Sequence, residues 1–251
     1  MQTRYEVKMN GAALSALDES IYITDIQEEA PRMEVTTIGR AGMDGQTMTA
    51  ERRLSLSVRV TFAIRAYDTS RRKEVLGLVH AWCAGGGALE ISDRPGQSLD
   101  VVCTTLPTAT SSLRWTEDIV MVFTAYERPY FVSAAPSSGT VTGTGGTVAL
   151  TPQGTARECV LEATVTNASA ENLDWVLITC GAQRMRFAGL AMAPGGTLRM
   201  EISRGILMLP VAYRTADSAD EIRLTQRVIN NVSISADKEI SATLSARGVW
   251  L

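Results

Sequence analysis

The longest regular pattern in the chain is an alternation of apolar and polar residues from Leu54 to Ile64. Every second position holds Leu, Val, Phe or Ile, and the positions between them hold Ser, Arg, Thr or Ala. Successive side chains of a strand point to opposite faces of a sheet, so this pattern predicts a half-buried β-strand. At about 3.3 Å per residue the strand would be roughly 36 Å long, about twice the usual length. We therefore expect the N-terminal half to be a sheet built around this strand.

Shorter patterns on both sides of this strand complete an α+β arrangement of strands, one helix, then strands. The helix is predicted over 69–83, with an N-cap from Asp68, Thr69 or Ser70 and a stop at the glycines 85–87. A glycine-containing loop is predicted over 39–50, and from the sequence it is either a flexible arm or the slack of a hairpin. The other predicted strands are Tyr5–Met9, Ile21–Ile26, Met33–Ile38, Ala88–Ser92, Leu99–Thr105 and Ile119–Thr124.

The second half alternates in many short segments without a strong helix. A stretch rich in Ser, Gly, Thr and Pro follows Phe131, which predicts a first domain over 1–131 and a linker over 132–146. The remaining residues, 147–251, carry turn signals about every ten residues and predict an all-β sandwich of jelly-roll type. We expect one strand of this sandwich to run from Ile229 or Val232 to Ile234, and another from Ile240 to Leu244.

Composition and charge exclude several function classes. The 251 residues carry a net charge of −3, so no cationic field attracts nucleic acid or an anionic membrane. No apolar run is long enough to span a bilayer, and no secretory signal is visible, so we expect a soluble protein made in a cytoplasm. The four cysteines, two in each half, would allow one disulfide per domain, but this compartment favours free thiols: Cys83, Cys103, Cys159 and Cys180.

The sequence offers little material for catalysis, and we expect no enzyme, no metal site and no cofactor. His80 is the only histidine, so neither a catalytic triad nor a finger-like zinc site has its ligands. No nucleophile elbow or phosphate-binding loop is present. Neighbouring carboxylates such as Glu28 and Glu29 could serve a glycosidase, but solvated charge is the ordinary explanation for them.

Carbohydrate binding by the second half is the better alternative from the residues. Sugars stack on exposed aromatic rings while Asn, Asp and Arg side chains fix their hydroxyls; Trp175 lies near Asn172 and Asp174, and Arg184 and Arg186 flank Met185. The ordinary structural interpretation is that Trp175 begins a core strand while the arginines point outward, because aromatic residues dominate cores. We favour the structural interpretation.

The order of these elements resembles the distal tail proteins of long-tailed, non-contractile bacteriophages. An opening strand pair and a glycine-containing loop lead into the alternating strand, followed by a helix with a basic start at Arg71–Lys73. A turn at Asp93–Gly96 and a closing Glu127–Tyr130 segment complete the first half. The second half is also similar, in the segments Val165–Asn167, Leu173–Ile178 and Phe187–Leu190.

The resemblance implies a structural protein of the virion tail tip, synthesised in the host cytoplasm. Six copies of a tail-tube-like first domain would form a ring, with a galectin-like sandwich projecting outward. The ring would join the tail tube protein and the tape measure protein to the tail-tip hub protein. DNA would pass through its lumen without specific binding, and no membrane insertion is expected.

Within that resemblance, sheet extension between neighbouring copies would close the ring. The candidate interface residues come from the long strand and the loop before it: Leu54, Leu56, Val58, Arg59, Val60, Gly42 and Gly45. Three acidic residues, Asp25, Glu28 and Glu29, are candidates for facing the lumen. A carbohydrate-binding module on a tail or cell-surface protein remains the second class, and it predicts a monomer with an exposed Trp175.

Overall fold

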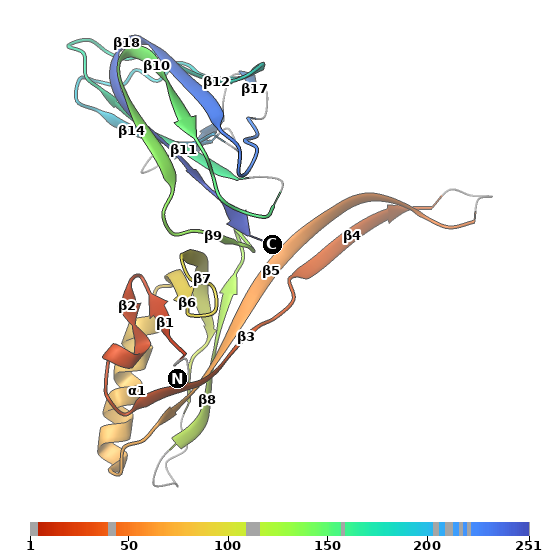
Figure 1. Cartoon of the computed structure of the whole chain (residues 1–251), viewed down its shortest axis with the longest axis vertical. Helices are drawn as coiled ribbons and strands as arrows, with labels where there is room; N and C mark the ends of the chain where they lie inside the picture. Colours follow the sequence, from red (N-terminus) through yellow and green to blue (C-terminus); the bar gives the residue numbers. More distant parts are fainter. Residues whose placement is uncertain are drawn as a thin grey trace. The chain divides into compact units, whose positions relative to one another are not determined.

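The structure, a computed structural model, describes residues 5–39, 44–108, 116–156, 159–202, 206–208, 213–215, 218–219 and 222–250. The chain divides into two compact units, Met1–Phe131 and Val132–Leu251, each with its own sheet (Figure 1). Strands dominate both units, and the described residues contain one α-helix, α1 (Thr69–Cys83). The predicted mostly β chain with a single helix is confirmed.

The first unit is organised around its longest strand, as predicted. β5 pairs with β3 and β4 along one edge and with β8 along the other, and the sheet order is β2-β1-β6-β7-β8-β5-β3. A short 3-10 helix, Leu14–Ala16, connects β2 to β3. The strands of this unit are β1 (Val7–Met9), β2 (Ala12–Ala13), β3 (Ile21–Glu28), β4 (Arg32–Ile38), β5 (Thr47–Ile64), β6 (Gly87–Ile91), β7 (Gln97–Thr105) and β8 (Thr116–Ala125).

The core of this unit lies between one face of the sheet and α1. Val58, Val60 and Phe62 of β5 are fully buried, as their alternation predicts. The helix buries Val75 and Val79, and its Trp82 ring meets Phe123 of β8 edge to face with the centroids 6.1 Å apart. Hydrophobic burial of these side chains therefore holds the helix on the sheet.

Local side-chain chemistry sets the ends of α1 at the predicted residues. The Asp68 carboxylate accepts hydrogen bonds from the backbone N–H groups of Ser70 and Arg71, which would otherwise be unpaired in the first turn. Gly85, at φ +81°, takes the left-handed conformation after the helix ends. The Arg71 side chain forms an ion pair with Asp18, which ties the helix start to the segment before β3.

The predicted loop over 39–50 is too long, because β5 begins at Thr47 rather than near Leu54. Residues Thr47–Ser55 pair with β4, with Met48 opposite Thr37 and Glu51 opposite Val35. The run Glu51–Arg53 breaks the alternation in the sequence. That run is tolerated in a strand here because the side chains of β4 are exposed on both faces, so no core excludes charge.

The second unit is built mainly of strands, and its described residues contain no α-helix. Its strands follow the order β16-β15-β14-β11-β18-β12-β13-β17, and β10 pairs with β18. The remaining strands, with β9 at the boundary between the units, are β9 (Phe131–Ser133), β10 (Ser137–Leu150), β11 (Val160–Asn167), β12 (Val176–Cys180), β13 (Gln183–Phe187), β14 (Thr197–Glu201), β15 (Ile206–Met208), β16 (Tyr213–Thr215), β17 (Ser218–Ala219), β18 (Asn230–Arg247) and β19 (Val249–Trp250).

This sheet folds over on itself along β10 and β18. The early part of β18 pairs with β12 and its late part pairs with β11, so the two predicted strands 229–234 and 240–244 are one bent strand. In β10, Gly139 lies against Val148, nine residues on, although a straight strand would separate them by about 30 Å. The two folded halves enclose one apolar core that includes Leu161, Ile178 and Leu244, an arrangement compatible with the predicted sandwich.

The predicted linker 132–146 is mostly strand, since β10 begins at Ser137. Its glycines suggest flexibility in the sequence, but they are needed for close packing. A Cβ atom on Gly139 would lie 2.4 Å from Cγ1 of Val148, and one on Gly146 would lie 2.8 Å from Cγ1 of Val141. Glycine therefore allows the two halves of β10 to approach each other.

Gly139→Val should destabilise the second unit by about 1–3 kcal/mol, because the new side chain overlaps Val148 in a packed core. Chemical denaturation measures the effect. Thr140→Val, at an exposed position of the same strand, is the matched control and should change stability by less than about 0.5 kcal/mol. Equal effects of the two substitutions would contradict the packing role of Gly139.

The first unit should lose stability as the pH falls through the acidic range. Hydrogen bonds from Ser20, and then Arg71, hold the pKa of the Asp18 carboxyl below its usual range. Its stabilising effect is therefore complete above the unfolded pKa, near 4, and is lost as the pH falls through the lower folded pKa. Asp18→Asn should lower stability at pH 7 and flatten the acid dependence of the thermal midpoint between pH 5 and pH 2. If Asp18→Asn lowered the thermal midpoint by the same amount at every pH, this role of Asp18 would be contradicted.

Candidate assembly interface

The most distinctive surface of the first unit is a two-stranded ribbon, the arm, formed by Arg32–Ile38 of β4 and Thr47–Ser55 of β5. β8 begins to pair with β5 only at Leu56, so β4 is the one neighbour of β5 in the arm among the described strands. Figure 1 shows the arm extending away from the rest of the first unit. Isolated two-stranded ribbons are marginally stable in water, so a partner surface would be expected to support this one.

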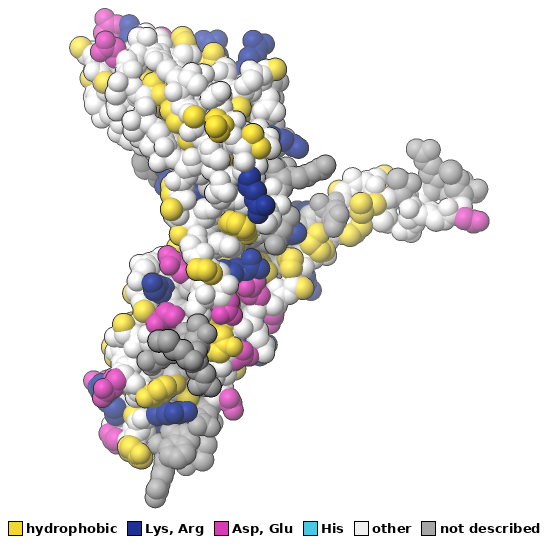
Figure 2. All heavy atoms as spheres, viewed as in Figure 1, with side chains coloured by type: hydrophobic (Ala, Val, Ile, Leu, Met, Phe, Trp, Pro, Cys, Tyr) yellow, Lys and Arg dark blue, Asp and Glu magenta, His cyan; other side chains and the backbone are white. Residues whose placement is uncertain are grey.

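The two faces of the arm differ in character. Met33, Val35 and Met48 share one face through the pairing of β4 with β5, and they are 43%, 52% and 58% exposed. Arg53 stands opposite Met33 in the same pairing, so this face, called the apolar face below, is mainly rather than purely apolar. The opposite face carries the ion pair between Glu34 and Arg52. Figure 2 shows hydrophobic side chains along the arm. Exposed apolar side chains that gather on one face mark an interaction surface.

The opposite face also exposes an apolar side chain, since Ile38 at the outer end of β4 is 55% exposed. It lies on the same face as Glu34, opposite Thr47. Gly45 lies between the two strands at φ +88°, a conformation that glycine adopts without strain. Gly42, the other glycine predicted for the interface, lies outside the described residues.

The other predicted interface residues are divided between the core and the surface. Leu56, Val58 and Val60 are buried in their own unit, and the backbone around them pairs with both β3 and β8. Neither their side chains nor their backbone is available to a neighbouring copy. Leu54, within the arm, is half-buried, and Arg59 is exposed on the other face of the sheet. The surface available for assembly therefore lies before Leu56, in the arm.

The three predicted lumen residues do not share one face. A bulge between Ile23 and Asp25 shifts the pairing of β3, so that Asp25 stands opposite Thr61 on the face of the sheet away from the core. Glu29 lies on that side as well, 3.6 Å from the Arg59 guanidinium. Glu28 stands opposite Val58 on the core face, because side chains three residues apart on a strand point to opposite faces.

Glu28 forms an ion pair with Arg94 that the sequence did not reveal. This Arg94–Glu28 pair, called the clasp below, holds the turn between β6 and β7 against β3. Arg94 donates hydrogen bonds to both Glu28 carboxylate oxygens, at 2.7 and 2.8 Å, and its guanidinium lies 4.6 Å from the centroid of the Phe131 ring. The bond to Glu28 raises the pKa of Arg94. Bidentate pairing and a cation–π contact fix the turn.

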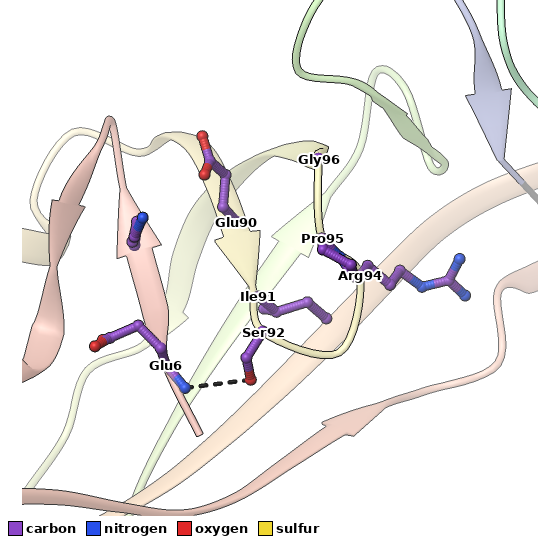
Figure 3. A pocket seen from close by; sticks show the side chains of 8 residues that line it. Glu6, Glu90, Ile91, Ser92, Arg94, Pro95 and Gly96 are labelled. Carbon is purple, nitrogen blue, oxygen red and sulfur yellow. Dashed lines mark hydrogen bonds between the residues drawn. The ribbon is translucent and has the colours of Figure 1, made fainter. Parts of the chain in front are cut away.

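A hollow of about 280 Å³ lies beside this turn. In Figure 3 the Arg94 side chain points away from Glu6 and Glu90, and the Glu6 backbone N–H donates to the Ser92 hydroxyl at 3.2 Å. The Glu6 carboxylate accepts a hydrogen bond from Ser15 at 2.6 Å. The lining thus holds no converging nucleophile, base and orienting group of the kind that catalysis requires.

In the second unit, the structure brings two of the predicted sugar-binding residues together. The Arg186 guanidinium lies 5.4 Å from the centroid of the half-buried Trp175 ring. The backbone N–H groups of Asp174 and Trp175 both donate to the Asp237 carboxylate. Asp237 therefore fixes the start of β12. The Arg186 guanidinium covers the Trp175 ring, on which a sugar would otherwise stack.

Other chemistry is sparse in the described part of the chain. The His80 ring nitrogen Nε2 lies 2.7 Å from the Pro107 carbonyl oxygen, and no cluster of three metal-ligating side chains occurs among the described residues. None of the four cysteines forms a disulfide. Within the described ranges, α1 is the one α-helix, and its 15 residues are too few to cross a membrane.

The fold and the arm define a class: a two-unit, β-rich protein with a projecting, partly apolar ribbon. No family model matches the sequence, and no curated protein does either. Among solved structures the chain is similar to the SPP1 Dit protein (gp 19.1), described as a paradigm of the hub adsorption apparatus in phages infecting Gram-positive bacteria. The TM-score is 0.60 at 11% identity, over 98% of this chain and 99% of that one.

Two structures of the phage p2 baseplate in its activated conformation are also similar. For the baseplate with Sr, the TM-score is 0.51 at 7% identity, over 97% of this chain and 97% of the matched chain. In the Ca-bound baseplate the TM-score is 0.50 at 6% identity, over 99% of this chain and 98% of that one. The resemblance to phage distal tail proteins predicted from the sequence is confirmed at the level of the fold, over nearly the whole chain.

The clasp predicts energetic coupling between Arg94 and Glu28. Arg94→Ala should destabilise the first unit by about 1–2 kcal/mol, and a double-mutant cycle with Glu28→Gln should give a coupling near 1 kcal/mol, because the pair is bidentate and only 28% exposed on each side. Urea denaturation measures each variant. The more exposed Arg52–Glu34 pair of the arm is the control and should couple by less than about 0.5 kcal/mol. Equal coupling in the two pairs would contradict the clasp.

Proposed function

We propose that this protein is a structural component of a phage tail tip, in which six copies form a ring that joins the tail tube to the tail-tip or baseplate hub. The proposal has support from the fold likeness to SPP1 Dit and to the phage p2 baseplate chains. The observation that carries it is the arm, whose apolar face is exposed in the single chain. This role requires no catalysis and no cofactor.

In the proposed ring, the arm of each copy lies on the first unit of the next copy. A cyclic assembly needs two different surfaces on each protomer, and a ribbon that extends from its own unit can reach beyond it. Burial of Met33, Val35 and Met48 would remove their exposed apolar surface from water. The unpaired backbone edge of β5 before Leu56 could also add to a neighbouring sheet.

The lumen would be lined by the face of the sheet that carries Asp25 and Glu29. Hydroxyl groups lie near its centre: Thr124 lies 3.2 Å from Ser57 and 3.0 Å from Thr104, oxygen to oxygen. The same face also carries Val102, which stands opposite Thr124 and is 45% exposed. The nearby Arg59 faces Glu29. A surface of hydroxyls, valines and the Arg59–Glu29 pair carries no excess of positive charge and would bind phosphates weakly, so DNA could pass without specific binding.

The second unit would be a galectin-like sandwich projecting from the ring, and the tail tube, tape measure and hub proteins would be the partners of the first. The carbohydrate-binding alternative has less support, because the Arg186 guanidinium already lies over the Trp175 ring. The proposed location is the virion tail tip, after synthesis in the host cytoplasm.

Substitutions on the two faces of the arm test the ring. Met33→Glu combined with Val35→Glu places two carboxylates on the apolar face and should reduce the assembly, as measured by analytical ultracentrifugation, to the 27.0 kDa monomer. Thr36→Glu, on the opposite face of the same strand, is the control and should keep a species of six times that mass.

Circular dichroism checks that all variants retain their strands, since the substituted side chains are exposed in the single chain. Assembly of the Met33/Val35 variant at the same concentration as the unmodified protein would overturn the role of this face. So would dissociation of the Thr36→Glu variant to the same extent.

A further inference from the structure

Two cysteine thiols from distant parts of the sequence lie together in the first unit. Cys83 is the last residue of α1 and is 1% exposed, and Cys103 lies on β7, half-buried. Cys103 stands opposite Phe123 in the pairing of β7 with β8, and Phe123 contacts Trp82, the neighbour of Cys83. Gly87, four residues after Cys83, pairs with Val101, two residues before Cys103, so the register brings the two cysteines close together, and they form no disulfide. Each thiol donates to a backbone carbonyl oxygen, Cys83 to His80 at 3.5 Å and Cys103 to Thr105 at 3.3 Å.

The surroundings keep both groups as protonated thiols at neutral pH. Burial, followed by the proximity of Cys103, raises the pKa of Cys83 to about 12. Burial also raises the pKa of Cys103. Since the thiolate is the reactive form, the pair is slow to react although the two groups lie close together.

We propose that Cys83 and Cys103 are a redox-sensitive pair that closes to a disulfide in the folded protein when a low-molecular-weight disulfide such as oxidised glutathione is present. The bond would join the end of α1 to β7 and fix the helix on the sheet. A reducing compartment keeps the pair open, and an oxidising one closes it.

The reaction proceeds by two thiol–disulfide exchanges. Cys103, the more accessible sulfur, loses its proton and attacks one sulfur of oxidised glutathione, which forms a mixed disulfide and releases one glutathione thiolate. Cys83 then loses its proton and attacks the Cys103 sulfur, which displaces the second glutathione thiolate. The two cysteines together lose two electrons and two protons, and one oxidised glutathione becomes two reduced molecules.

The experiment treats the folded full-length protein with oxidised glutathione and identifies the products by peptide mass mapping after alkylation. The half-buried Cys180 is replaced by serine throughout, so that it cannot react with glutathione. The expected product is a peptide pair linked through Cys83 and Cys103, without bound glutathione. The linked protein should unfold at a temperature higher by roughly 5 °C or more, because the cross-link restricts the unfolded chain.

Single substitutions separate the two steps. Cys83→Ala should leave a stable mixed disulfide of glutathione on Cys103, because no second thiol displaces it. Cys103→Ser should leave Cys83 unreacted, because burial shields that sulfur from glutathione. Unreacted thiols at both Cys83 and Cys103 in the Cys180→Ser protein, or a persistent mixed disulfide at Cys103 while Cys83 is present, would overturn the proposal.

The pH dependence adds an independent readout from the same protein. Because the pKa of Cys103 is raised, its thiolate fraction, and with it the rate of linkage, should increase about tenfold per pH unit from pH 7 to pH 9. A rate independent of pH over that range would contradict the proposed first attack by Cys103.

Discussion

The pairing of one strand, β5, determines most of the first unit. From Leu56 to Ile64 its backbone is paired on both edges and its alternate side chains are buried, so this part belongs to the core. Before Leu56 the same strand keeps only β4 as a neighbour, and apolar side chains such as Met48 are exposed. A single continuous strand thus supplies the interior of one protomer and the surface proposed to join it to the next. The rigid core anchors the base of the arm.

In the second unit, the long strands β10 and β18 build the core by bending rather than by extending beyond it. β10 and β18 pair with each other along nearly their whole length and bend together, and the bend turns one sheet into two facing layers around a shared core. Gly139 makes this possible because a side chain there would overlap Val148. The shift in pairing between Gly143 and Gly145 places an irregularity at the bend, where glycine accepts the required backbone.

Features set by neighbours in the sequence could be predicted, and features set by distant contacts could not. The alternation of β5 and the cap of α1 at Asp68 are local, and the structure bears out both. The strand character of Thr47–Arg53 depends on pairing with β4, and the continuity of β18 depends on β10, so their sequences alone suggested a loop and two strands. The Arg94–Glu28 clasp joins residues 66 positions apart, and no local pattern predicts it.

Electron microscopy of the purified, unmodified protein tests the central claim most directly. Class averages should show closed rings with six-fold symmetry, in which the arm of each protomer lies along the first unit of its neighbour and the apolar face with Met33 and Val35 is covered. Single two-unit particles at concentrations well above the micromolar range would contradict the account. Rings in which the arm points into solvent would also contradict it, because the apolar face would then have no partner.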